Sequence, residues 1–191
     1  MRRLPFTILL VSVAWVAAAC DDPLSLGPAT DANFIDTVVV YALRGTSIDL
    51  PSGYDVVIRE TARTDRADPF DFAFDLSAEG TALIYPRSAL GLTRQSGVLV
   101  MDDEFAEIDE APLEDYQLEA EVAVSAETVF VVRSRAESGG VVACPFFVGA
   151  LPRYGKFRVV SIDATERSIT LESLVNVNCG YRGLEPGIPT Q

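Results

Sequence analysis

The sequence contains no histidine in its 191 residues, and this absence removes several classes of function. Histidine is the most common general base in enzymes and the most common metal ligand in proteins. A Ser-His-Asp or Cys-His nucleophilic site, a zinc site with histidine ligands and a histidine-ligated haem therefore cannot form. The glycine-rich phosphate-binding patterns of the G-x-G-x-x-G and Walker types are missing as well. We predict no catalytic residue, no metal ligand and no cofactor.

Basic residues are also few, with 15 Lys and Arg against 28 Asp and Glu and a net charge of -13. Nucleic acid and anionic lipid both attract basic surfaces, so we expect neither to bind this chain through charge. Lys156 is the only lysine, and it lies two residues before Arg158 in a strand-like segment. Since residues two apart in a strand share a face, we expect both on a solvated face. A nucleophilic Ser-Lys site is the weaker interpretation.

The clearest long apolar run is at the N-terminus, from Leu4 to Ala19, after Arg2 and Arg3. This layout is typical of a secretory signal peptide, which we assign to residues 1–19. The run is shorter than the roughly 20 residues that a membrane-spanning helix needs, so a transmembrane anchor is the weaker interpretation.

Three small residues, Ala17, Ala18 and Ala19, lead directly into Cys20. This order resembles the lipobox of bacterial lipoproteins, although Ala17 stands where that family usually has leucine. The resemblance implies that Cys20 is acylated, as with palmitate, and becomes the mature N-terminus, which would anchor the domain to a membrane of the cell envelope, outside the cytoplasm. A plain secretory signal is the alternative. The mature chain would carry 13 basic and 28 acidic residues, a net charge of -15, and would lose Trp15, the only tryptophan.

Cysteine is scarce too, since only Cys144 and Cys179 remain once Cys20 is assigned to lipid. Two thiols in an exported protein most simply form one disulfide bond, which is our prediction for this pair. A reactive or metal-binding pair is the weaker interpretation, because neither cysteine has a C-x-x-C partner or a nearby histidine.

Residues 20–33 are rich in proline and glycine and predict a flexible tether behind the lipidated cysteine. Residues 34–191 are dominated by strand patterns without a helical stripe longer than about two turns. They predict one all-β domain, a single antiparallel sandwich or partly closed barrel, with an irregular C-terminal tail from Gly180. The expected strands are 35–43, 54–61, 69–76, 81–85, 97–101, 118–124, 128–133, 140–144, 156–162 and 168–175.

Two details of this pattern carry further expectations. In residues 69–76 the three phenylalanines, Phe70, Phe72 and Phe74, alternate with Asp71 and Asp75, so the rings should share one buried face and the carboxylates the other. Polar turns connect 118–124 with 128–133 and 156–162 with 168–175, which predicts two hairpins.

Carboxylates and aromatic residues are the remaining candidates for a site. The acidic segment 102–115 predicts a solvated loop, with a calcium site as the alternative, although it lacks the EF-hand spacing. Pairs of carboxylates could also serve a hydrolase, but an acidic chain offers many such pairs. Phe146, Phe147, Tyr154 and Phe157 could line an apolar pocket, and packing beside the disulfide is the simpler interpretation.

Three strand-like segments of the domain are informative together: residues 128–134 (TVFVVRS), 154–160 (YGKFRVV) and 70–74 (FDFAF). They resemble segments of HmuY-like haem-carrier lipoproteins. The resemblance implies a tethered all-β fold. The best-known members bind haem iron through histidines, which this chain lacks, so a haem site here would need one of six tyrosines or Met101.

These observations together favour a non-catalytic cell-envelope lipoprotein that binds a partner protein or a small apolar ligand. The alternatives are a carboxylate-dependent hydrolase, a haem-binding lipoprotein that uses ligands other than histidine, and a purely structural surface protein.

Overall fold

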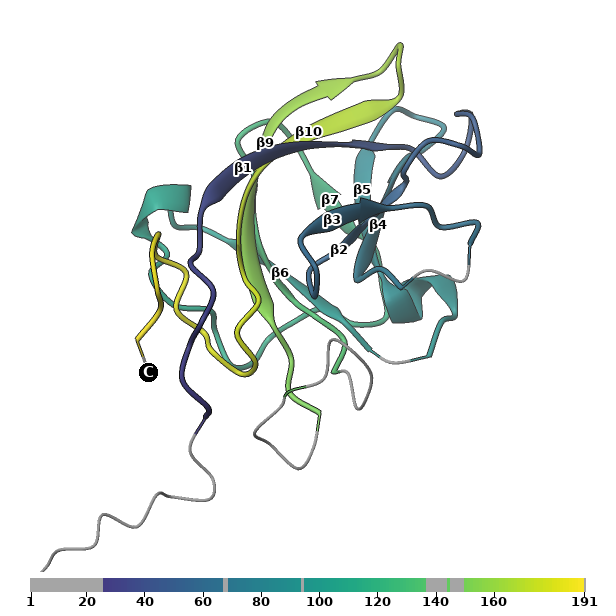
Figure 1. Cartoon of the computed structure of the whole chain (residues 1–191). Coiled ribbons are helices and arrows are strands. Elements are labelled where there is room, and N and C mark those ends of the chain that lie inside the picture. The colour runs from purple at the N-terminus through teal and green to yellow at the C-terminus, as the bar shows by residue number, and fades with distance from the viewer. Residues whose placement is uncertain (1–25, 67–68, 94, 137–143, 145–149, 191) are drawn as a thin grey trace, which may run out of the picture.

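β-Branched and aromatic residues alternate with polar ones through most of the chain, and they form strands rather than long helices. The computed structural model describes residues 26–66, 69–93, 95–136, 144 and 150–190. Within these ranges, ten strands form two five-stranded antiparallel sheets that pack as a sandwich, which confirms the predicted all-β fold (Figure 1). The signal peptide at 1–19, Cys20 and most of a strand expected at 140–144 lie outside the described residues.

One sheet has the strand order β1-β10-β9-β8-β6, and we call it the long sheet; the other, the short sheet, has the order β3-β2-β4-β5-β7. The strands are β1 (Ile35–Tyr41), β2 (Gly53–Asp55), β3 (Glu60–Ala62), β4 (Phe72–Leu76), β5 (Ala82–Pro86), β6 (Gly97–Met101), β7 (Val122–Val124), β8 (Val129–Arg133), β9 (Tyr154–Asp163) and β10 (Ser168–Asn176), with short 3₁₀ helices at Arg87–Leu90 and Phe105–Glu107. None of the helices in the described ranges has the length and apolar content to cross a lipid bilayer.

The main core lies between the two sheets and is built on aromatic rings. Phe72 and Tyr54 of the short sheet stack with their ring centroids 5.6 Å apart, and Phe130 and Phe157 of the long sheet stack at 5.3 Å. The two pairs meet edge to face, with Phe72 and Phe157 centroids 5.2 Å apart. Offset and edge-to-face pairs are the favoured ring arrangements, so these four side chains fix the contact between the sheets.

A second core covers part of the outer face of the long sheet. The segment 105–118 crosses this face and buries Phe105, Ile108 and Tyr116 against the strands. The crossing is close, because a Cβ added to Gly97 of β6 would lie 2.6 Å from the Cβ of Tyr116. Backbone hydrogen bonds of 3.0 and 2.8 Å join Val98 and Gln117 in both directions at the same place.

The hairpin predicted from 156–162 and 168–175 is confirmed, since β9 and β10 are antiparallel neighbours along their whole length. The Asp163 carboxylate accepts hydrogen bonds of 2.8 and 2.9 Å from the backbone N–H groups of Thr165 and Glu166 and so fixes the turn.

The hairpin predicted from 118–124 and 128–133 is wrong. β7 pairs with β5 in the short sheet, whereas β8 pairs with β6 and β9 in the long sheet. The turn between them is real, with Thr128 N–H bonded to Ser125 O at 3.0 Å, but it carries the chain from one sheet to the other.

The single strand predicted at 54–61 is also wrong, because a turn at residues 56–59 divides it into β2 and β3. The Asp55 carboxylate accepts a 2.8 Å hydrogen bond from the Val57 backbone N–H, and Arg59 takes a φ of 60°. A side chain that binds its own backbone two residues on is a common way to begin a turn.

The described part of the predicted tether, residues 26–33, is held against the domain rather than free. Asn178 accepts hydrogen bonds from the backbone N–H groups of Thr30 and Asp31, at 2.8 and 3.1 Å. Asn33 and Gly187 exchange backbone hydrogen bonds of 2.7 and 2.9 Å. Figure 1 shows this stretch, in purple before β1, beside the yellow C-terminal segment. The C-terminal tail has no long strand but is likewise fixed by these bonds.

Candidate functional site

A pocket of about 700 Å³ opens on the outer face of the long sheet, where the covering segment 105–118 begins. All five strands of that sheet, or the turns beside them, contribute to it. The lining residues are Ile35, Val100, Met101, Asp102, Asp103, Glu104, Phe105, Ala106, Glu127, Thr128, Val129, Arg158 and Glu172. Its volume falls within the range of small-molecule sites, which is about 300–1,000 Å³.

The pocket floor follows from the register of the sheet. Glu172 of β10 is paired with Arg158 of β9, Arg158 with Val129 of β8, and Val129 with Met101 of β6. Directly paired residues in an antiparallel sheet project from the same face. The four side chains therefore form one continuous row across the floor of the pocket.

Arg158 is neutralised within the pocket. Its Nε and Nη2 atoms lie 2.9 and 2.8 Å from a Glu172 carboxylate oxygen, and its Nη1 lies 3.2 Å from Glu127. The three carboxylates of Asp102, Asp103 and Glu104 are exposed at the rim and make no ion pair among the residues that the structure describes. The lining therefore holds five carboxylates and one guanidinium, and its net charge is negative.

Lys156 holds the wall of the pocket in place. Its Nζ donates a 2.9 Å hydrogen bond to the backbone oxygen of Ile108 and lies 4.7 Å from the ring centroid of Phe105. Burial lowers the pKa of this ammonium, and the carboxylate of Asp109 opposes that effect. The predicted solvated face for Lys156 is wrong: Lys156 shares its face with Arg158, but the segment 105–118 covers it.

The acidic segment 102–115 is only partly the solvated loop that we predicted. Its carboxylates are exposed, but Phe105, Ile108 and Ala111 are buried and attach it to the long sheet. For the calcium alternative, no group of three or more carboxylate or cysteine side chains in the described ranges is arranged to hold a metal ion.

The aromatic candidates do not form the pocket. Phe157 lies in the main core and Tyr154 in the second core, while Phe146 and Phe147 lie outside the described residues. Of the side chains considered as haem ligands, Met101 lines the pocket and none of the six tyrosines does.

A buried ion cluster lies elsewhere in the sandwich, and the sequence pattern did not reveal it. Arg135, which follows β8, reaches into the short sheet and binds Asp55 through two bonds of 3.1 and 2.9 Å. Its Nη1 also lies 3.0 Å from Asp71, and all three side chains are at most 2% exposed. The backbone N–H groups of Arg135 and Val56 each donate a 2.8 Å hydrogen bond to Asp71. Burial raises the pKa of Asp71 to about 6, and Arg135 opposes this effect.

The prediction for residues 69–76 is correct except for Phe70. Phe72 and Phe74 do share the main core, but Phe70 precedes β4 and packs in a separate small cluster. Asp71 and Asp75 are buried on the opposite face, because arginines pair with both of them. Arg44 donates its Nε–H to Asp75, and Arg167 lies 3.6 Å away from it.

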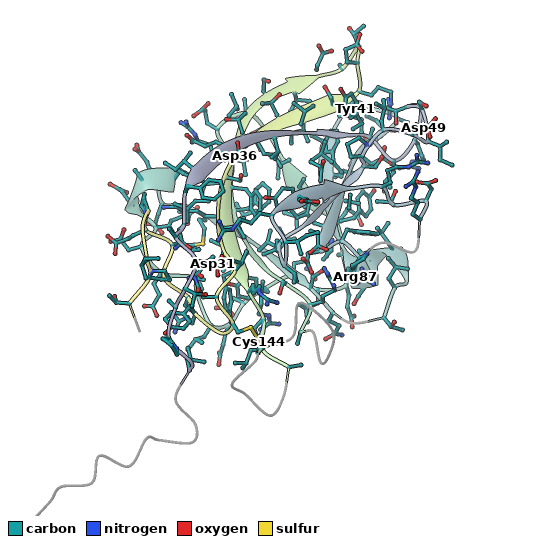
Figure 2. The ribbon with its side chains drawn as sticks, in the orientation of Figure 1. Asp31, Asp36, Tyr41, Asp49, Arg87 and Cys144 are labelled. Carbon is teal, nitrogen blue, oxygen red and sulfur yellow. A yellow bond between two sulfur atoms is a disulfide. The ribbon has the colours of Figure 1, made fainter. Side chains whose placement is uncertain are left out.

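The predicted disulfide between Cys144 and Cys179 is confirmed, with Cα atoms 5.6 Å apart. Figure 2 shows Cys144 and its yellow sulfur at the same end of the molecule as the docked N-terminal stretch around Asp31. Cys179 directly follows Asn178, which binds that stretch, so the covalent bond and the docking contact share one short segment.

No protein-family model and no curated protein matches this sequence.

Proposed function

We propose that this chain is a non-catalytic lipoprotein of the bacterial cell envelope, and that its β-sandwich binds a small ligand in the pocket of the long sheet. The pocket carries the proposal. It combines a floor fixed by four paired strands, a wall held by Lys156 and a rim of exposed polar groups. Ligand sites are typically concave and combine apolar side chains with polar groups that orient the ligand.

The arrangement of the carboxylates favours binding over hydrolysis. A hydrolase of this kind needs two carboxylates of different pKa that reach the substrate together. The two desolvated carboxylates that do converge, Asp55 and Asp71, are both buried against Arg135 and do not line the pocket. The lining carboxylates Glu127 and Glu172 are both paired with Arg158.

The anchoring part of the proposal rests on the signal peptide and on Cys20. We expect Cys20→Ser to move the protein from the membrane pellet to the soluble exported fraction, because acyl chains supply the membrane affinity. Unchanged pelleting after a wash in mild salt would contradict lipid anchoring.

The binding part is tested by affinity capture from envelope extract, with bound small molecules and proteins identified by mass spectrometry. The full mature chain carrying Cys20→Ser serves as bait, because it stays in solution. Ala106→Trp fills the pocket from its exposed wall, and Ala120→Trp adds the same ring at an exposed position outside the pocket. We expect a ligand to be retained by the bait and by the Ala120→Trp control, and to be lost with Ala106→Trp. Equal retention by all three would contradict the pocket as the binding site.

A further inference from the structure

We propose that the ligand of the pocket is a small organic cation, an ammonium or guanidinium group carried on an apolar chain. This inference rests on the proposed function, because it names the chemical class of the ligand for the same pocket. The residues that line the pocket account for both features of this ligand, its positive charge and its apolar chain.

The positive charge follows from the balance of groups around the cavity. Five carboxylates and one guanidinium line it, and the guanidinium of Arg158 is already bound to Glu127 and Glu172. The carboxylates of Asp102, Asp103 and Glu104 remain as exposed acceptors on one side. Clefts lined by charge of one sign concentrate ligands of the opposite sign, and the net charge of -13 on the whole chain acts in the same direction.

The apolar chain follows from the side chains beneath that rim. Ile35 is 53% exposed and Val100 is 42% exposed, and both line the pocket together with Met101 and Val129. An apolar ligand that covers these exposed aliphatic side chains removes their surface from water, and this burial favours binding. Methionine adapts its shape to such ligands readily.

The distribution of the carboxylates fits an organic cation better than a metal ion. A calcium ion needs six to eight oxygens that converge at about 2.3–2.6 Å. Among the described residues no three carboxylates converge in this way, and those of the pocket are divided between one side of its rim and the ion pairs of Arg158. An ammonium group needs only one or two such acceptors at hydrogen-bond distance.

The test is an NMR titration of the full mature chain carrying Cys20→Ser with three probes that share one chain: hexylammonium, hexan-1-ol and hexanoate. We expect saturable shifts of the backbone amides at residues 100–106 and 127–129 with hexylammonium. Binding of hexan-1-ol should be about tenfold weaker because it lacks the charge, and hexanoate should not saturate. Raising the salt concentration should weaken the binding of hexylammonium and leave the binding of hexan-1-ol unchanged.

Two triple variants separate the local rim from the overall charge. Asp102→Asn, Asp103→Asn and Glu104→Gln together neutralise the rim, and we expect them to weaken hexylammonium binding at least about tenfold. The control variant removes the same charge from exposed positions outside the pocket, through Glu79→Gln, Glu119→Gln and Glu121→Gln. It should change the affinity for hexylammonium less than about twofold. Equal effects of the two variants would overturn the inference.

The remaining outcomes distinguish this inference from the proposed function. Two results would show that the ligand is not an organic cation: binding of hexan-1-ol or hexanoate as tight as that of hexylammonium, or stoichiometric displacement of hexylammonium by calcium. Neither result would contradict the pocket as the binding site. Capture of a neutral or anionic natural ligand that Ala106→Trp abolishes would have the same meaning. If Ala106→Trp left the capture of the natural ligand unchanged, the proposed function would be wrong, and so would this inference.

Discussion

Buried charge is the dominant feature of this molecule at the scale of single residues. Arg135 joins Asp55 and Asp71, Arg44 and Arg167 join Asp75, and Lys156 lies beneath the covering segment. Among these groups, the buried ones are Asp55, Asp71, Asp75, Arg135 and Lys156; they lost hydration on folding, and hydrogen-bond partners offset the loss. The Arg135 cluster also links the end of β8 to both β2 and the residue before β4, so it ties the two sheets together.

Asp71 makes stability depend on pH. Its pKa is raised to about 6 in the folded chain, against an ordinary value of 3.8, so the folded state binds a proton more tightly than the unfolded state. Stability from this group is therefore present at low pH and is lost as pH rises through about 4 to 6. Relative to Asp71→Asn, we expect the wild type to gain about 2 kcal/mol between pH 7 and pH 4.5, measured by urea unfolding. Asp103→Asn, at an exposed position, should leave the pH dependence unchanged; parallel curves for wild type and Asp71→Asn would contradict the assignment.

Residue-scale burial was the part that the sequence could not predict. Alternation of Phe and Asp in 69–76 correctly indicated a strand and placed the carboxylates on the face opposite the rings, but it could not show that this face is covered. Arg135, which buries Asp71, lies 64 positions away in the chain. For Lys156 we predicted a solvated face, and this was wrong because the segment that covers it is distant in the chain. The acceptor of its hydrogen bond, the backbone oxygen of Ile108, lies 48 positions away. Local periodicity reports which face a side chain occupies, and only the tertiary structure decides whether that face is covered.

At the scale of elements, the segment 105–118 both stabilises the long sheet and shapes the pocket. It buries apolar residues on the outer face of the sheet and places Phe105 at the boundary between the second core and the cavity. Its far end is fixed by the contact of Tyr116 and Leu118 with Gly97 of β6.

Gly97 tests how closely this segment must approach. In Gly97→Ala the new methyl group would lie 2.6 Å from the Tyr116 Cβ and 2.8 Å from Leu118, so the segment must shift. We expect a loss of about 1–3 kcal/mol in the free energy of unfolding and faster amide exchange at 116–118. The matched control is Gly183→Ala, whose methyl group would meet only ordinary contacts of 3.4 Å or more and should cost less than about 0.5 kcal/mol. Equal losses for both variants would argue against a specific close approach.

The sequence predicted the positions of most strands, but it predicted less well which strands pair with one another. The strand at 97–101 has the predicted bounds, and β9 and β10 pair as their short polar turn indicated. The turn at 125–128 has the same polar character, yet its flanking strands enter different sheets. A turn sequence specifies a change of direction, whereas core packing decides which sheet receives the next strand. The acidic segment and Lys156 were both noticed in the sequence, but the pocket beside them depends on cross-strand register.

At the scale of the whole molecule, the disulfide joins Cys179, which follows β10, to Cys144, which precedes β9 in the chain. The bond closes a loop across a sequence separation of 35 residues. Replacing both cysteines by serine should cost about 2–4 kcal/mol, because the unfolded chain regains the entropy that the crosslink removes. Chemical unfolding with and without reductant measures this loss in the wild type, and the double variant should be insensitive to reductant. An unchanged unfolding midpoint after complete reduction would contradict a stabilising role.

The docking of residues 26–33 onto the C-terminal segment has a mechanical consequence for an anchored protein. With Cys20 held in the bilayer, only residues 21–25 separate the lipid from the docked chain, a reach of at most about 20 Å. If Cys20 is acylated as proposed, a pull on the anchor first meets the hydrogen bond between Gly27 and Tyr181, and then those of Thr30 and Asp31 with Asn178, one residue before the crosslinked Cys179. These bonds must break before tension along the chain reaches β1, whose first residue, Ile35, lines the pocket.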